Sequence, residues 1–106
     1  MNYDLKKEEG VFMTTQMQLA RAGQITPAIV AVAADEGVDA EVLRQRVAAG
    51  TVAICANINH AGLKPRGFGR GLRTKVNANI GTSSAFPAVE PELAKLRAAI
   101  DAGADA

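Results

Sequence analysis

The spacing of apolar and polar positions predicts three short helices in the first half of the chain. Each predicted helix follows a residue whose side-chain oxygen can accept a hydrogen bond from the first-turn amides. Each is also followed by a glycine, the residue that most readily adopts the left-handed conformation at a helix end. The expected caps are Thr14 or Thr15, then Thr26 with Pro27 as the first helical residue, then Asp39, and the expected stops are Gly23, Gly37 and Gly50.

Apolar stripes at helical spacing predict which faces of these helices are buried. The first helix is expected to run through Arg21 and the second to about Glu36. The stripe of the second helix comprises Ile29, Val32 and Ala33, and that of the third comprises Val42, Leu43 and Val47.

The hydrophobic period changes after residue 50. The run Thr51–Ala56 is apolar and β-prone and predicts a short strand, in which Cys55 is expected to be an inert core thiol. A turn-rich stretch, Gly62–Gly71, is expected next. A second strand is predicted over Leu72–Ile80, closed by Gly81–Ser84.

A last helix is predicted after Phe86–Pro87, with Pro91 at its first position and Glu90 and Glu92 near the positive end of its dipole. A strand followed by a helix is the first half of a βαβ unit, so a parallel partner strand is expected after residues 103–106. The chain is therefore expected to be cut at an element boundary of a larger α/β protein, although a small α+β domain ending in this helix is the alternative. The expected buried stripe is Leu93, Leu96, Ile100 and Ala104, with Gly103 as the stop.

Composition limits the chain to one small domain with a thin core, because its 106 residues are 48% hydrophobic but only 4% aromatic. A net charge of +1 gives no general attraction to nucleic acid or membrane. The polar first ten residues are not a secretory signal. Cys55 and His60 are the single cysteine and the single histidine. One of each cannot build an iron–sulfur cluster or a structural zinc site, and the lone thiol suits a reducing cytoplasm.

The charge distribution supplies a first candidate site. No acidic residue lies between Val42 and Val89, and five basic residues fall within twelve positions around the glycine-rich stretch. Arginine forks and loop amides suit a phosphate, and the alternative is a solvated basic face. RNA binding has weak support because Phe68 is the only aromatic residue there, and the Gly67–Gly71 run is expected to be a turn. The basic residues are Arg44, Arg46, Lys64, Arg66, Arg70, Arg73 and Lys75.

Two asparagine-rich segments supply a second candidate. In a strand, Asn77 and Asn79 point to the same face. A carboxamide buried there without a partner costs roughly 1 to 3 kcal/mol, which suggests a task such as binding a heterocycle edge or a ribose. The alternative is that the carboxamides satisfy a loop backbone. In the segment from Asn57 to His60, the histidine is a candidate base or metal ligand, or simply a hydrogen-bonded structural residue.

The motifs of the chain resemble those of phosphomethylpyrimidine synthases. Thr15–Pro27 is similar to the opening of that family, and Ala53–His60 is similar to its P-A-N-x-N-H stretch. Lys75–Gly81 resembles K-[IV]-N-x-N-I-G, which begins the family's barrel, and Gly103–Asp105 matches the G-A-D before its next strand. The resemblance covers residues 14–106, and it is the combination of motifs that is specific.

The resemblance implies an α/β fold in which short amino-terminal helices and a small α/β region precede the first strand and helix of a (β/α)8 barrel. The expected organisation is a flexible leader at 1–12, an amino-terminal α/β region at 13–70 and the first βα unit of a truncated barrel at 71–106. The resemblance implies that Asn79 contacts the substrate. It implies less strongly that Asn77 plays a supporting role in substrate binding. No catalytic or metal-binding residue is expected in this chain.

The implied activity is that of a cytoplasmic carbon–carbon lyase of thiamine biosynthesis, a homodimer that converts aminoimidazole ribotide to hydroxymethylpyrimidine phosphate. The family uses S-adenosylmethionine, a [4Fe-4S] cluster on a carboxy-terminal cysteine motif, and a divalent metal, zinc. This chain alone would bind none of these cofactors and would be catalytically incomplete. No membrane or nucleic-acid partner is expected.

Two departures and two alternatives accompany the resemblance. Cys55 stands where the family usually has proline, and Thr82 stands where many members have asparagine. Hydroxybenzimidazole synthases of anaerobic cobamide biosynthesis share these motifs and the same substrate. A different kind of function is the second alternative: a non-catalytic domain for assembly, phosphate binding or RNA binding. It would use the basic loop, Lys64–Lys75.

Overall fold

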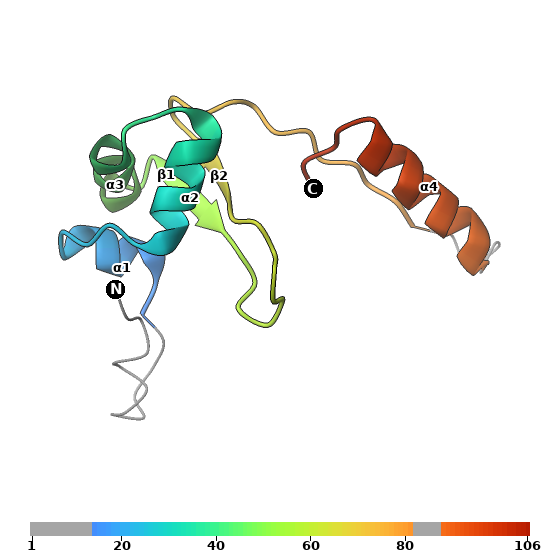
Figure 1. The fold of residues 1–106 in the computed structure, drawn as a ribbon, viewed down its shortest axis with the longest axis horizontal. Coiled ribbons are helices and arrows are strands. Elements are labelled where there is room, and N and C mark those ends of the chain that lie inside the picture. Colours follow the sequence, from blue (N-terminus) through green and yellow to red (C-terminus); the bar gives the residue numbers. More distant parts are fainter. Residues whose placement is uncertain (1–13, 82–87) are drawn as a thin grey trace. The chain divides into compact units, whose positions relative to one another are not determined.

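The computed structural model describes residues 14–81 and 88–106 (Figure 1). These residues fall into two compact units that divide between Arg73 and Thr74, here called the amino-terminal unit and the carboxy-terminal unit. The expected leader at 1–12 and the segment 82–87 lie outside the described residues. The elements are α1 (Gln16–Arg21), α2 (Pro27–Glu36), α3 (Ala40–Ala49), β1 (Val52–Cys55), β2 (Arg66–Gly69) and α4 (Val89–Asp101).

The three helices of the amino-terminal unit begin and end where the sequence predicts. The side-chain oxygens of Thr15, Thr26 and Asp39 each accept a hydrogen bond from a first-turn amide. In α1 the side chain of Gln18 also accepts a bond from the backbone of Thr15, which completes a capping box. The helix stops are confirmed as well, since Gly23, Gly37 and Gly50 all have positive φ.

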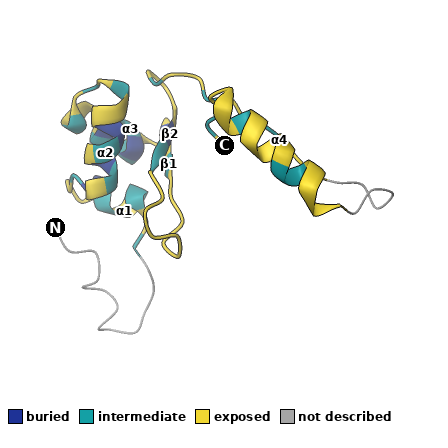
Figure 2. Cartoon of the chain, turned by 45° about the vertical axis from the view of Figure 1, so that its right-hand side comes forward, coloured by how far each residue is buried: buried dark blue, intermediate teal, exposed yellow. Residues whose placement is uncertain are grey.

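The core of the amino-terminal unit lies where α2, α3 and β1 meet (Figure 2). The predicted stripe of α2 is confirmed, because Ile29, Val32 and Ala33 are all buried. In α3 the prediction was wrong for Val42, whose side chain is 39% exposed. Helix α3 buries a narrower stripe, and the buried residues that complete the core are Ala20, Leu43, Val47 and Val52.

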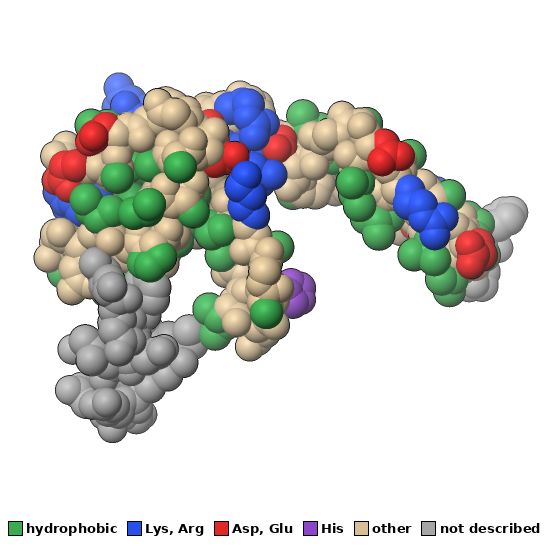
Figure 3. Space-filling model, viewed as in Figure 1, with side chains coloured by type: hydrophobic (Ala, Val, Ile, Leu, Met, Phe, Trp, Pro, Cys, Tyr) green, Lys and Arg blue, Asp and Glu red, His purple; other side chains and the backbone are tan. Residues whose placement is uncertain are grey.

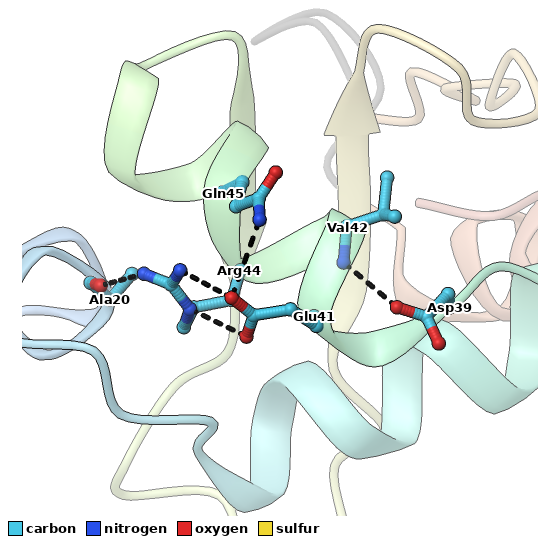
Figure 4. A network of polar contacts seen from close by, with 6 residues as sticks. All are labelled: Ala20, Asp39, Glu41, Val42, Arg44 and Gln45. Carbon is cyan, nitrogen blue, oxygen red and sulfur yellow. Dashed lines mark hydrogen bonds and ion pairs between the residues drawn. The ribbon is translucent and has the colours of Figure 1, made fainter.

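Arg44 ties α3 to α1 through one guanidinium group (Figure 4). One side of the group donates two hydrogen bonds to the carboxylate of Glu41, one turn earlier on the same helix. Another nitrogen donates to the carbonyl oxygen of Ala20 in the last turn of α1, at 2.7 Å. The arginine therefore adds a side-chain bond to a carbonyl that also accepts from the amide of Gly23 at the end of α1.

The second strand is not where the sequence predicts. The glycine-rich stretch, expected to be a turn, contains β2, which pairs antiparallel with β1 so that Val52 lies opposite Gly69 and Cys55 opposite Arg66. Close packing explains the glycine at position 67, because a Cβ atom there would lie 2.6 Å from Cγ1 of Val32. Glycine marks a strand that approaches a neighbouring helix closely, and not only a turn.

The expectation that Cys55 is a core thiol was also wrong. Alternation along β1 turns Val52 and Ile54 toward the helices and Ala53 and Cys55 away from them. Cys55 is exposed as a result. The helices cover only one face of this two-stranded sheet, so only every second side chain of the apolar run is covered.

The carboxy-terminal unit contains α4, which starts two residues earlier than predicted. Pro91 is the third helical residue, and Glu90 and Glu92 lie in the first turn as expected. The predicted buried stripe was wrong, because the structure buries no residue of α4 (Figure 2). The side chains of Leu96 and Ile100 are 42% and 63% exposed.

The predicted strand Leu72–Ile80 forms no strand in the described structure, but part of it is paired. The amide of Ala78 donates to the carbonyl of Ala106 at 2.8 Å, and the carbonyl of Val76 accepts from the amides of Asp105 and Ala106. Ala106 thus bonds to the residues on both sides of Asn77, which is the hydrogen-bond pattern of two parallel segments. The segments before and after α4 are therefore joined by backbone bonds in a parallel sense.

The buried cap Thr26 should contribute more to stability than the exposed cap Thr15. The Thr26 hydroxyl accepts from the amide of Ile29 and donates to the side chain of Gln16 at 2.6 Å. Thr26→Val should destabilise the start of α2 by about 1 to 2 kcal/mol, so α2 amides should exchange roughly tenfold faster. Hydrogen exchange of α2 peptides measures this effect. The control is Thr15→Val, measured on α1 peptides. If Thr15→Val speeds exchange in α1 as much as Thr26→Val speeds it in α2, or more, the prediction is contradicted.

Asp105 should hold the extended segment in place through its carboxylate, which accepts from the amide of Val76 at 2.8 Å. Asp105→Ala should speed hydrogen exchange in the peptide that covers residues 74–81 by about three- to tenfold. Asp105→Asn is the matched control, because its carbonyl oxygen can still accept. Equal exchange in the two variants would show that the bond contributes nothing.

Candidate functional site

Asn77 and Asn79 lie together on one face of the extended segment, as the sequence predicts. The side-chain amide of Asn77 donates to the side-chain oxygen of Asn79 at 2.8 Å, and both residues are exposed. The alternating residues Ala78 and Ile80 instead line a shallow hollow of about 210 Å³ against α4 residues such as Leu96. The segment therefore has one apolar face toward α4 and one carboxamide face away from it.

The asparagine pair leaves two polar groups open. No other bond from either carboxamide exists in the part of the chain that the structure describes. The amide nitrogen of Asn79 is left as a donor, and the side-chain oxygen of Asn77 is left as an acceptor. A donor beside an acceptor on one face suits the edge of a heterocycle or a ribose.

The earlier asparagine segment, from Asn57 to His60, belongs to the amino-terminal unit. The side-chain oxygen of Asn57 accepts from the amide of Asn59 at 2.9 Å, and its carbonyl accepts from the amide of His60. Asn57 thus satisfies a loop backbone, the alternative that the sequence left open. His60 is exposed, and its side chain has no hydrogen bond within residues 14–81 and 88–106.

The basic residues around β2 contact two acidic residues at the end of α2. The carboxylate of Asp35, in the last turn of α2, binds Lys64 at 3.0 Å and Arg66 at 2.9 Å. The next residue, Glu36, accepts from the backbone amide of Arg73. Figure 3 shows basic and acidic side chains side by side on this part of the surface. Two of the proposed phosphate-binding cations therefore already have a partner.

A signal for this pairing exists in the sequence. Carboxylates in the last turn of a helix face the negative end of its dipole, which disfavours them unless a cation lies near. The hydrogen bond from Lys64 lowers the pKa of Asp35 most, desolvation opposes the shift, and the charges of Lys64 and Arg66 add to it. The pKa of Glu41 is likewise lowered, chiefly by its hydrogen bond with Arg44.

Arg46 and Arg70 both line a shallow surface hollow of about 400 Å³, together with Gln45 and Thr51. The guanidinium of Arg46 donates to the backbone carbonyl of Arg70 at 3.4 Å. Gly71 packs tightly against that guanidinium, with no room for a Cβ atom. The contact ties the end of β2 to α3, which is a structural use of the charge.

The described residues do not fit a metal centre or an iron–sulfur cluster. Nowhere in residues 14–81 and 88–106 do three histidine, cysteine or acidic side chains gather as a metal ion requires. A cluster takes three or four thiolates, and the chain has one cysteine. None of the helices in the described part of the chain combines the length and apolarity needed to cross a bilayer.

Comparison with known proteins identifies the family. The family model described as the radical SAM ThiC family matches residues 15–106, which is most of the chain. The chain belongs to the radical SAM ThiC family. The matched range contains both asparagine segments and α4.

Individual members of the ThiC family support the assignment. The phosphomethylpyrimidine synthase of Desulforamulus reducens is 59% identical over 92 residues, which are 87% of this chain and 21% of that protein. The phosphomethylpyrimidine synthases of Desulfitobacterium hafniense and Moorella thermoacetica are 55% identical over 89 residues and 56% identical over 92, covering 84% and 87% of this chain and 21% of each relative. The chain thus spans about a fifth of the length of these relatives.

Replacing Asp35 should loosen the β1–β2 hairpin in a pH-dependent way. A lowered pKa means that the ionised carboxylate stabilises the folded state above the unfolded pKa, about 3.9, and that this contribution is lost as the pH falls through the lower folded value. At pH 7, Asp35→Asn should therefore speed hydrogen exchange of residues 64–69 by about two- to threefold.

The pH series provides the control for this prediction. As the pH falls through the folded pKa of Asp35, exchange in the Asp35→Asn and wild-type hairpins should converge, once the intrinsic pH dependence is removed. Glu41→Gln removes a comparable surface ion pair without touching the hairpin, so it should leave exchange in residues 64–69 unchanged. A difference between wild type and Asp35→Asn that does not shrink as the pH falls would contradict the electrostatic origin.

Proposed function

We propose that the chain is the amino-terminal part of a phosphomethylpyrimidine synthase. In this proposal the complete protein is a radical S-adenosylmethionine carbon–carbon lyase of thiamine biosynthesis, which converts aminoimidazole ribotide to hydroxymethylpyrimidine phosphate. The observation that carries the proposal is the family match over residues 15–106, together with relatives of that name at 55–59% identity. The complete enzyme would be a cytoplasmic homodimer.

Asn79 is the residue that we propose contacts the ribotide. The exposed carboxamide pair supports this role, because it is directed away from α4 and keeps a donor and an acceptor open. The parallel rung at residues 76–78 supports assignment of the segment as the first strand of a (β/α)8 barrel. Ligands of such barrels bind at the carboxyl ends of the strands, and Asn79 would lie near that end.

The cofactors of the complete enzyme would be held elsewhere. A [4Fe-4S] cluster with S-adenosylmethionine would generate the radical, and a zinc ion would be a further cofactor. One exposed cysteine does not fit a cluster, so in this proposal the cluster and metal ligands lie outside these 106 residues. The contribution of this chain would be to bind and orient the substrate.

Product analysis would separate this proposal from its sister activity. A hydroxybenzimidazole synthase of cobamide biosynthesis would use the same ribotide, and the described contacts favour neither product. Anaerobic turnover of the complete enzyme with aminoimidazole ribotide, followed by mass spectrometry, should yield hydroxymethylpyrimidine phosphate. Hydroxybenzimidazole as the sole product would replace the thiamine assignment with the cobamide one.

Removing the Asn79 carboxamide should weaken substrate binding. In the complete enzyme, Asn79→Ala should lower the affinity for aminoimidazole ribotide about tenfold or more, because a ligand polar group loses its hydrogen-bond partner. Calorimetric titration measures this directly. Asn59→Ala is the matched control. Asn59 is the second asparagine of the other N-x-N motif, and its side chain makes no bond in the described structure. Unchanged affinity in Asn79→Ala would overturn the role.

A further inference from the structure

A hollow on the amino-terminal unit contains two arginine side chains that have no acidic partner. Arg46, in the last turn of α3, and Arg70, directly after β2, both line this hollow of about 400 Å³. In the part of the chain that the structure describes, neither side chain pairs with a carboxylate. Glu41 is the acidic residue nearest to Arg46 in sequence, and both of its carboxylate oxygens bind Arg44 instead (Figure 4). The hollow therefore carries two positive charges without a counter-charge.

The backbone around residue 70 holds the guanidinium of Arg46 in place. This group donates to the carbonyl of Arg70 at 3.4 Å, and a Cβ atom at Gly71 would overlap it. Because the carbonyl belongs to residue 70, the side chain of Arg70 begins beside the Arg46 guanidinium. A guanidinium has five N–H donors, and the remaining donors of Arg46 make no bond in the described residues. One arginine is thus anchored through a single N–H and keeps the others open next to a second arginine.

We propose that Arg46 and Arg70 form a binding site for a phosphate monoester. Guanidinium groups bind phosphate oxygens through paired N–H donors. A phosphate monoester carries about 1.5 to 2 negative charges at pH 7, which match the two cations. Like charges side by side repel each other, so an anion between the arginines removes an unfavourable interaction of the free protein. The inference goes beyond the proposed function, because neither arginine takes part in the proposed substrate contact.

The hollow differs in this respect from the other basic positions of the amino-terminal unit. Lys64 and Arg66 share the carboxylate of Asp35, so a phosphate bound there would have to break an existing ion pair. At Arg46 and Arg70 no ion pair has to break. The hollow is also lined by Val42, whose side chain is 39% exposed, and this side chain offers an apolar surface to the ester group of the ligand.

The test is an NMR titration of the 106-residue chain with methyl phosphate at pH 7, at constant ionic strength. The Nε–H signal of each arginine side chain reports on its own guanidinium. The signals of Arg46 and Arg70 should move along one saturating curve, with a dissociation constant on the order of 1 mM. Those of Arg44 and Arg66, which have carboxylate partners, should stay in place. Different curves for Arg46 and Arg70, or equal movement of all four signals, would overturn the inference.

Arg70→Gln is the decisive variant, because Arg46 bonds to the backbone carbonyl of residue 70 and glutamine retains that carbonyl. The variant should bind methyl phosphate about tenfold more weakly than the wild type. Lys64→Gln is the matched control, since it removes the same charge from a cation that is paired with Asp35. Its affinity should change by less than about twofold. Equal weakening in the two variants would mean that net charge attracts the anion, and the site would be rejected.

Two further measurements separate a phosphate site from a structural role and from a carboxylate site. Without ligand, Arg70→Gln should unfold at the same temperature as the wild type or at a higher one, because it loses a repulsion and no described contact. A lower unfolding temperature would assign Arg70 to the fold and count against the proposal. Acetate, with a single charge, should bind roughly tenfold more weakly than methyl phosphate. Equal affinity for acetate would rule out the phosphate assignment.

Discussion

The backbone pairing of residues 76–78 with residues 104–106 is the constraint on which the proposed site depends. It holds the segment extended, and an extended segment turns consecutive side chains to opposite faces. Ala78 and Ile80 consequently face α4, and Asn77 and Asn79 face away from it. A shift of this pairing by one residue would turn the carboxamides toward α4 and the apolar side chains to the opposite face. A few backbone bonds therefore decide which chemistry the segment presents.

The two units differ in how far their apolar side chains are covered. The amino-terminal unit closes around seven buried apolar residues, whereas α4 in the carboxy-terminal unit buries none. The exposed side chains there include Val76, Ile80 and Ile100, at 61%, 46% and 63%. Apolar faces of this kind are normally covered in a folded protein. A single βα unit cannot bury both faces of its strand, so this exposure agrees with the proposal of a larger barrel.

Local chemistry made the helices predictable, and tertiary packing made the rest harder to predict. Threonine, aspartate and glycine mark helix ends through bonds within one turn, so the bounds of α1, α2 and α3 follow from the sequence. Strand β2 was missed because its glycine at position 67 is required by contact with Val32 on α2, a neighbour distant in sequence. The shared face of Asn77 and Asn79 was predictable from period two, but the bond that joins their side chains was not, because it depends on side-chain rotamers.

The basic residues around β2 illustrate why clustered charge alone is a weak guide to a binding site. The carboxylates of Asp35 and Glu36 lie at the end of α2, where the helix dipole disfavours them. They are stabilised by Lys64, Arg66 and the amide of Arg73, which come from the loop and the segment after it. A cation that neutralises a helix end is less available to a phosphate, since binding would have to break an existing pair. The asparagine pair has the opposite character, because it is satisfied internally on one side and open on the other. Polar groups without a partner are available to a ligand, and this difference favours the carboxamides over these cations as the proposed site.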